Sequence, residues 1–329
     1  MYSRKSIRNR CRALGIRFVW DPSARIGRMR IIDFQDLTKE DKLVLDRHFS
    51  NGYYENSHFN FTNFFMWREP YHVRWAEDGD VLYMTCEWEG ELMAIQPFCA
   101  EEKWPEATAK ILSYFEEQGR PVLFTGIEKA YAEFLEQYDG ASFEIEDDRD
   151  NWDYVYEAEK LISLSGRKLH SKKNHLNAFR KMYPQAEYLP ITEDIITACK
   201  IELNNWYKLR IQDELDDPFI GWERKAILEI FNDFDYFKLK GGAIRLDDRI
   251  IAFTFGEALN ADTAVIHVEK ADPNIRGAYP AINQGFVEHA WSAMTYINRE
   301  EDMGHEGLRK AKESYKPFKM IEKFNAHRK

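Results

Sequence analysis

The last quarter of the chain places a strand, a glycine turn and a helix in immediate succession, and this order restricts the fold more than any other feature. Residues 263–269 are rich in β-branched side chains, and Arg276-Gly-Ala-Tyr-Pro-Ala-Ile-Asn283 then forms the turn and the helix start. Backbone N–H groups at a helix start suit a phosphate or a developing oxyanion. The run Gly-Leu-Arg-Lys-Ala-Lys-Glu-Ser-Tyr-Lys-Pro at 307–317 adds clustered cations. The combination predicts a site for acyl transfer.

The length of the chain, 329 residues, exceeds that of an ordinary single domain and predicts two domains. No apolar run is long enough to span a bilayer, and the N-terminus has no apolar signal segment. We therefore expect a cytoplasmic protein that is soluble, or at most peripheral at the inner membrane surface. Four widely spaced cysteines form no Cys-x-x-Cys pair, which fits a reducing compartment and predicts no zinc site.

Charge is distributed unevenly along the chain. Residues 1–30 carry a net charge of +8, while the rest of the chain carries −18. We interpret 1–30 as a flexible basic tail; the alternative is a basic arm that touches RNA or anionic lipid. The acidic body argues against indiscriminate binding to nucleic acid, and no DNA partner is predicted.

The same order of elements is predicted twice: helices, an antiparallel meander, and then a strand followed by a helix. In the first half we expect strands at 30–34, 71–75, 81–88, 91–98 and 122–125, with helices near 38–49, 105–117 and 130–137. In the second half we expect strands at 236–239, 243–246, 250–255, 263–269, 295–298 and 319–324, with helices at 193–209, 222–231, 278–291 and 306–314. The repeated order indicates a duplicated α+β fold.

These elements predict two tandem domains, each a mixed and mostly antiparallel sheet flanked by helices. The predicted ranges are 1–30 for the tail, 31–150 for the first domain, 151–185 for a linker with a basic helix, and 186–329 for the second domain with the active site. The first domain has only Gly-Ile-Glu-Lys after its strand at 122–125. We therefore expect it to supply scaffold and part of the substrate groove.

The segment 160–186 contains seven basic residues, two histidines and no acidic residue. Its apolar residues fall near helical spacing, so one face packs and the other is cationic. We predict that Lys168, Lys172, Lys173 and Arg180 contact a polyanion such as an RNA acceptor stem or lipid headgroups. The alternative is an ordinary solvated helix face whose charges are satisfied by nearby carboxylates.

Several motifs in order resemble one known family. They are Ser-His-Phe-Asn-Phe-Thr-Asn-Phe-Phe-Met-Trp at 57–67, Ser-Lys-Lys-Asn-His-Leu-Asn-Ala-Phe at 171–179, Glu-Lys-Ala-Asp at 269–272 with Gly-Ala-Tyr-Pro-Ala-Ile-Asn at 277–283, and the terminal Gly-Leu-Arg-Lys-x-Lys run. From residue 31 onward the chain resembles the phosphatidylglycerol lysyltransferase C-terminal domain family. The membrane-bound lysyltransferases carry a large transmembrane portion before this domain, and no such segment is found in this chain.

The resemblance implies two tandem acyltransferase domains of the Gcn5-related N-acetyltransferase (GNAT) fold, the architecture shared with Fem-type peptidyltransferases. It also implies aminoacyl-tRNA as the donor and no other cofactor. The implied acceptor is a lipid headgroup, a peptidoglycan precursor or another amine or hydroxyl. Lys312 falls where those enzymes have a lysine near the reacting ester, and it could neutralise charge on the leaving oxygen or on a terminal phosphate.

Other residues are predicted to form the site around Lys312. His267 and Glu269 lie on one face of a strand and are the candidates to accept the acceptor's proton or to bind the amino group of the donor; the alternative is a structural His–carboxylate pair. Since an aminoacyl ester is already activated, we predict neither a metal nor a covalent nucleophile. Candidate donor and substrate contacts are Arg276, Gly277, Ala278, Tyr279, Asn283, Arg309, Tyr315 and Trp206.

Two alternatives to the aminoacyltransferase stay open. One keeps the fold but uses acetyl- or acyl-coenzyme A as the donor; Tyr279 occupies the last small position of the expected coenzyme A loop, which disfavours it. The other is a non-catalytic GNAT-like binding or regulatory module. In that case substitution of Lys312 would leave every activity unchanged.

Overall fold

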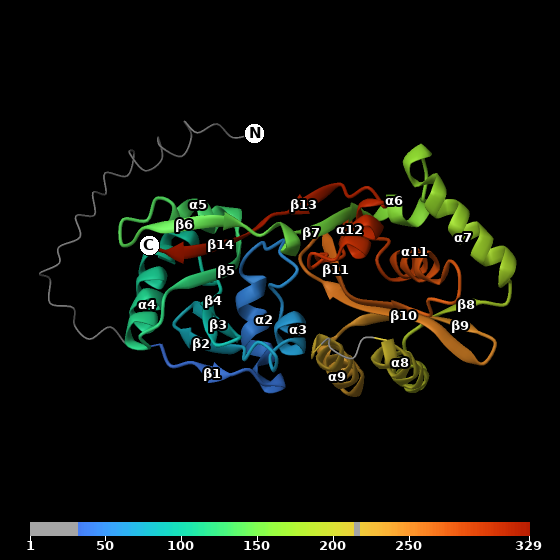
Figure 1. Cartoon of the computed structure of the whole chain (residues 1–329), viewed down its shortest axis with the longest axis horizontal. Coiled ribbons are helices and arrows are strands. Elements are labelled where there is room, and N and C mark those ends of the chain that lie inside the picture. The colour runs from blue at the N-terminus through green and yellow to red at the C-terminus, as the bar shows by residue number, and fades with distance from the viewer. Residues whose placement is uncertain (1–31, 214–217) are drawn as a thin grey trace, which may run out of the picture. The chain divides into compact units, whose positions relative to one another are not determined.

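The computed structural model describes residues 32–213 and 218–329, and residues 32–329 belong to one compact unit. The predicted basic tail, 1–30, lies outside the described residues. Two seven-stranded sheets dominate the unit (Figure 1). Both are mixed and mostly antiparallel and are flanked by helices, so the predicted α+β fold of two tandem GNAT-like domains is confirmed.

The first sheet has the strand order β1-β2-β3-β4-β5-β14-β6. Its strands are β1 (Gln35–Asp36), β2 (Arg74–Asp78), β3 (Val81–Trp88), β4 (Glu91–Ala94), β5 (Leu123–Glu128), β14 (Lys323–Arg328) and β6 (Phe143–Asp147). Strands β2 to β4 form an antiparallel meander, whose turn at Gly90 has a φ of 81°. Strands β4 and β5 are parallel and pair only through Ala94 and Phe124, so they diverge beyond that point.

The second sheet repeats this plan in the order β13-β7-β12-β11-β10-β9-β8. Its strands are β13 (Lys319–Ile321), β7 (Asp153–Glu157), β12 (Tyr296–Asn298), β11 (Thr263–Ala271), β10 (Arg249–Ala258), β9 (Lys240–Leu246) and β8 (Glu187–Pro190). Strands β8 to β11 are antiparallel. Strands β11 and β12 are parallel, as β4 and β5 are in the first sheet.

Sheet membership corrects the predicted domain ranges at two strands. The C-terminal strand β14 leaves the second half and pairs antiparallel with both β5 and β6 of the first sheet (red arrow in Figure 1). Strand β7, placed in the predicted linker 151–185, belongs to the second sheet. The prediction of one continuous strand at 319–324 was also wrong, because the chain changes sheets between β13 and β14. The pairing of β14 closes a gap that would otherwise expose two strand edges.

Helices cover both sheets. They are α2 (Lys42–Ser50), α3 (Phe61–Met66), α4 (Trp104–Glu117), α5 (Lys129–Leu135), α6 (Ala158–Ser163), α7 (His170–Met182), α8 (Glu193–Asp213), α9 (Pro218–Asn232), α10 (Phe234–Phe237), α11 (Ala278–Ala290) and α12 (Glu306–Glu313). In α4, Ala107, Ile111 and Phe115 recur at helical spacing and are buried with α5 against the first sheet. Residues 236–239 were expected as a strand, but α10 takes up their first part.

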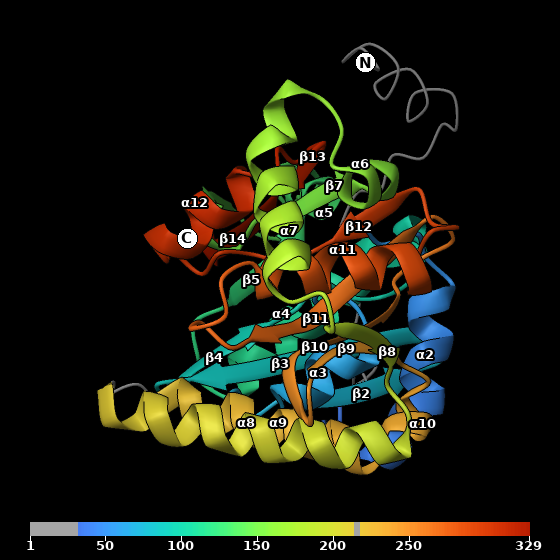
Figure 2. The ribbon, with the colours of Figure 1, turned by 90° about the vertical axis from the view of Figure 1, so that its right-hand side faces the viewer.

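One apolar core is shared by the two halves of the chain. It joins α2 and α3 of the first half to α8, α9 and α10 of the second. Phe61 and Phe65 lie next to Phe237, with ring centroids 6.0 and 5.0 Å apart, respectively. The opposite face of the second sheet is covered by α6, α7 and α11. Figure 2 shows α7, the predicted basic helix, beside α11, and these two helices are in contact.

Candidate active site

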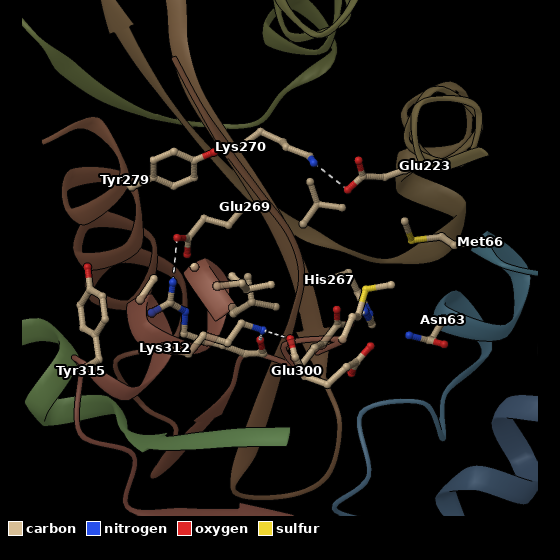
Figure 3. A pocket seen from close by; sticks show the side chains of 18 of the residues that line it. Asn63, Met66, Glu223, His267, Glu269, Lys270, Tyr279, Glu300, Lys312 and Tyr315 are labelled. Carbon is tan, nitrogen blue, oxygen red and sulfur yellow. Dashed lines mark hydrogen bonds and ion pairs between the residues drawn. The ribbon is translucent and has the colours of Figure 1, made fainter. Parts of the chain in front are cut away.

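A pocket of about 610 Å³ lies where β11 and β12 diverge. The two strands pair only from 263 to 265 and from 296 to 298, after which β12 ends and β11 continues. The pocket is lined by 266–270 of β11, the loop 299–303 and one side of α12. Asn63 and Met66 of α3 also reach it from the first half of the chain (Figure 3). Both halves therefore build the site.

Lys312 lines this pocket and holds the loop that follows β12. Its side chain is buried, and its Nζ donates to the backbone oxygen of Arg299 at 2.6 Å and to that of Glu301. Burial lowers the pKa of Lys312, although the carboxylates of Glu301 and Glu300 oppose the shift. Glu300 itself has a φ of 56°, a conformation that costs free energy and that these bonds help to maintain.

His267 lines the pocket between two carboxylates. Its Nε2 lies 3.0 Å from Glu257 and its Nδ1 lies 3.0 Å from Glu300. Burial alone would lower the pKa of His267, but the two carboxylates outweigh burial and raise the pKa to about 9. Near neutral pH the ring is therefore an imidazolium that donates from both nitrogens. This geometry favours the structural His–carboxylate pair over a proton acceptor.

Glu269 also lines the pocket and is held at both oxygens. Oε1 accepts from Nη2 of Arg299 at 2.8 Å, and Oε2 accepts from Nδ2 of Asn283 at 2.9 Å. The Arg299 guanidinium lies 4.9 Å from the ring centroid of Tyr315. Its Nη1 is buried and has no hydrogen-bond partner among the described residues. Arg299 is thus the prominent pocket donor that the sequence analysis missed, although it opens a charged run directly after a predicted strand.

The predicted donor-binding residues divide into two groups. Tyr279 and Tyr315 line the pocket, whereas Arg276, Gly277 and Ala278 do not. Gly277 has a φ of 89°, and a Cβ at this position would lie 2.8 Å from the Cβ of Phe179 on α7. The N–H of Ala278 donates to the backbone oxygen of Ile275. Close packing of α11 on α7 therefore requires this glycine.

Three further predicted contacts lie outside the pocket lining and interact with other side chains of the protein. Arg309 donates to Asp302 at 2.9 and 2.7 Å and to Asp150 at 2.7 Å, so it anchors the loop before α12. Asn283 orients Glu269, as described above. Trp206 stacks on Phe253 in the shared core, with centroids 5.7 Å apart. Arg309 and Asn283 thus support the site indirectly, and Trp206 is a core residue.

The predicted polyanion contacts lie on α7 and the turn before it. Lys168, Lys173 and Arg180 are exposed, while Lys172 is half-buried and lines the pocket, with its Nζ 4.4 Å from the centroid of Tyr315. In the part of the chain that the structure describes, no carboxylate pairs with Lys168, Lys173 or Arg180. Arg180 donates to Gln284 at 3.1 Å. These charges are therefore not neutralised by neighbouring side chains.

A buried polar network lies beneath the pocket loop and joins the two halves of the chain. The Nζ of Lys323, fully buried on β14, lies 2.7 Å from Asp153, 3.0 Å from His58 and 3.4 Å from Glu301. Asp153 accepts from the N–H and the hydroxyl of Ser57, each at 2.7 Å. The sequence analysis missed this network, because its members are far apart in the chain.

A second, apolar pocket of about 300 Å³ adjoins the first one. The two pockets share Asn63, Trp67, Glu301 and Met303. Most of the lining of the second pocket comes from the first half of the chain. The large apolar side chains that the first half contributes are Phe59, Phe64, Trp67, Tyr71, Val73, Trp88, Met93 and Ile95. The aromatic segment 59–67 thus contributes to the shared core and to this pocket alike.

Within 32–213 and 218–329, no three His, Cys, Asp or Glu side chains are grouped so that they could hold a metal ion. No helix in these ranges combines the length and apolar character needed to cross a bilayer.

Two solved protein structures resemble this chain. A conserved protein of unknown function from Bacteroides thetaiotaomicron is 33% identical, with a TM-score of 0.85 over 91% of this chain and all of that one. The structure of L-PGS from Bacillus licheniformis gives a TM-score of 0.61 at 15% identity, over 88% of this chain and 92% of that one, and so shares the fold.

A curated relative, an uncharacterized protein of Mycoplasmoides gallisepticum, is 29% identical over 178 residues. The match spans 52% of this chain and 54% of that relative, about half the length of each. The family model described as phosphatidylglycerol lysyltransferase, C-terminal, matches residues 52–327. The chain therefore belongs to the phosphatidylglycerol lysyltransferase C-terminal family, as its sequence motifs predicted.

Proposed function

We propose that this chain transfers an aminoacyl group from aminoacyl-tRNA to a hydroxyl of a lipid headgroup. The observation that carries the proposal is the pair of adjoining pockets. A charged pocket with buried donors suits the reacting ester, and an apolar pocket beside it suits part of an acyl chain. Their shared residues, Asn63, Trp67, Glu301 and Met303, would then lie where the headgroup meets the ester.

The reaction needs little from the protein beyond alignment and charge stabilisation. The acceptor hydroxyl attacks the ester carbonyl carbon, the bond to the ribose oxygen breaks, and the hydroxyl proton ends on that oxygen. Arg299 would stabilise the oxyanion, because its buried Nη1 has no partner among the described residues. Lys312 uses two of its N–H groups on backbone carbonyls, which leaves one for the leaving ribose oxygen.

The exposed cations of α7 support tRNA as the donor. Lys168 and Lys173 are exposed and unpaired with carboxylates in the described part, whereas Lys172 enters the pocket. A phosphate backbone that follows this helix would lead its 3′ end toward the ester site. The tight packing at Gly277 speaks against a pyrophosphate at the start of α11, as coenzyme A would require. A protein with this acceptor would work peripherally at a membrane surface.

The test is transfer of radiolabelled amino acids from a charged total tRNA pool in the presence of a membrane-lipid extract. We expect protein-dependent movement of label from tRNA into the lipid fraction, lost in Lys312→Met and kept in Lys310→Met. Lys310 lies on the same helix, but its side chain is 72% exposed. Label that stays on tRNA, together with saturable binding of acetyl-coenzyme A, would overturn the proposal. Label that moves into a water-soluble acceptor would overturn the lipid part alone.

A further inference from the structure

A third pocket lies where β4 and β5 diverge, the position in the first sheet that corresponds to the candidate active site in the second. It has a volume of about 420 Å³, within the range of small-ligand sites. Gln96 and Phe98 line it after β4, and Glu128 and Tyr131 line it at the end of β5 and in α5. It shares no lining residue with the candidate active site.

The charge of this pocket is negative. Asp80, Glu101 and Glu128 line it, and none of its described lining residues is Lys or Arg. Lys103, outside the lining, pairs with Asp80 at the exposed surface. Within the described part, the hydrogen bonds of the Glu128 carboxylate fall on one oxygen, Oε1, which accepts from the N–H groups of Glu55 and Asn56 at 3.2 Å each. The other oxygen is left for a ligand, and an anionic ligand would be repelled.

Aromatic rings form much of the remaining wall. Trp104 and Tyr131 pack edge to face with centroids 5.2 Å apart, and Tyr54 and Phe98 do so at 5.4 Å. The faces of such rings attract ammonium groups, most strongly where water is excluded. Carboxylates and aromatic rings together are the combination that recognises organic cations.

His48 contributes a buried acceptor. Its side chain is 3% exposed, and its Nε2 lies 2.6 Å from a carboxylate oxygen of Glu77. Since a carboxylate only accepts, Nε2 carries a proton, and in the tautomer with its proton on Nε2 the Nδ1 atom is an acceptor. Nδ1 is buried and has no partner among the described residues. A ligand N–H group would satisfy it.

We propose that the first half of the chain binds a small organic amine in this pocket, with the ammonium group at Glu128 and His48 and the carbon skeleton against Trp104. The site occupies the place of a GNAT donor pocket, yet its charge excludes the phosphates of a nucleotide or of coenzyme A. This proposal does not depend on the proposed transfer reaction, and it is tested by measuring ligand binding.

The test is calorimetric titration of the full chain with benzylamine, benzyl alcohol and benzoate at pH 8. Burial raises the pKa of Glu128 to about 7, so its carboxylate is ionised at that pH. We expect saturable binding of benzylamine, weaker binding of benzyl alcohol and none of benzoate. Absence of saturable benzylamine binding, or equal binding of benzoate, would overturn the proposal.

Substitutions of pocket residues test where the ligand binds. Glu128→Gln should weaken benzylamine binding at least about tenfold, because a charge-assisted hydrogen bond is lost. Glu102→Gln is the matched control, since Glu102 is exposed and does not line the pocket. If Glu128→Gln does not fold, as judged by its thermal melt, Trp104→Leu takes its place and should also weaken binding. Unchanged affinity in the folded variant would contradict the assignment.

Discussion

The charge on His267 predicts that the protein loses stability as pH rises from 6.5 to 9. The folded pKa of about 9 exceeds the ordinary value of 6.5. Because the folded protein binds this proton more tightly than the unfolded chain does, the protonated ring stabilises the fold. This contribution is fully present below pH 6.5 and is lost as pH rises through 9. The difference of 2.5 pH units corresponds to about 3 kcal/mol as an upper bound. The two carboxylates, each 3.0 Å from the ring, supply this stabilisation.

Urea denaturation followed by circular dichroism, at pH values from 6 to 9.5, measures this contribution (about 1.4 kcal/mol for each pH unit of pKa difference). The wild type should be more stable than His267→Gln at pH 6.5, and the gap should close toward pH 9.5. Titrating groups that do not contact His267 affect both proteins equally, so the gap reports on His267 together with its partners Glu257 and Glu300. His327→Gln is the control, because His327 has a side chain that is 46% exposed. A gap that stays constant across the pH range would refute the reasoning.

Three further outcomes are expected. Lys323→Met should lower the free energy of unfolding in urea by about 3–5 kcal/mol, because Asp153 and Glu301 lose a buried partner; a loss no larger than in the exposed Lys129→Met would contradict this. Gly277→Ala should cost more than about 1 kcal/mol in the same assay, since its φ is 89° and its Cβ would meet Phe179; a neutral effect would show that α7 gives way easily. Joint replacement of Lys168 and Lys173 by Ala should weaken tRNA binding and reduce the slope of log Kd against log salt by about 2 in filter binding; an unchanged slope would remove α7 from the tRNA contact.

The sequence predicted those parts of the site that depend on neighbours in the chain. The strand at 263–269, the glycine turn and the helix after it are consecutive, so their local pattern was sufficient to predict them. The same holds for the basic helix α7, whose apolar residues have helical spacing. Lys312, His267 and Glu269 were found because a resemblance or a strand pattern identified them, and the structure brings all three to one pocket.

The sequence could not predict features that depend on distant pairing. Strand β14 joins the first sheet from nearly 200 residues away, as its contact between Lys323 and Glu128 shows. Asp153 and Lys323 meet for the same reason, and neither lies in a motif. Residues 236–239 were expected as a strand because aromatic residues favour strands, but packing of Phe237 in the shared core gives α10 instead. Gly277 was assigned to a ligand, whereas close helix packing explains it.

The most direct test of the central claim is a single-turnover measurement of label transfer from one purified aminoacyl-tRNA to lipid. Lys312→Met and Lys310→Met are compared with the wild type. We expect Lys312→Met to slow transfer by roughly 10²–10³, while Lys310→Met stays near the wild-type rate. Equal rates in the two variants would contradict the claim that the pocket between β11 and β12 carries out the reaction.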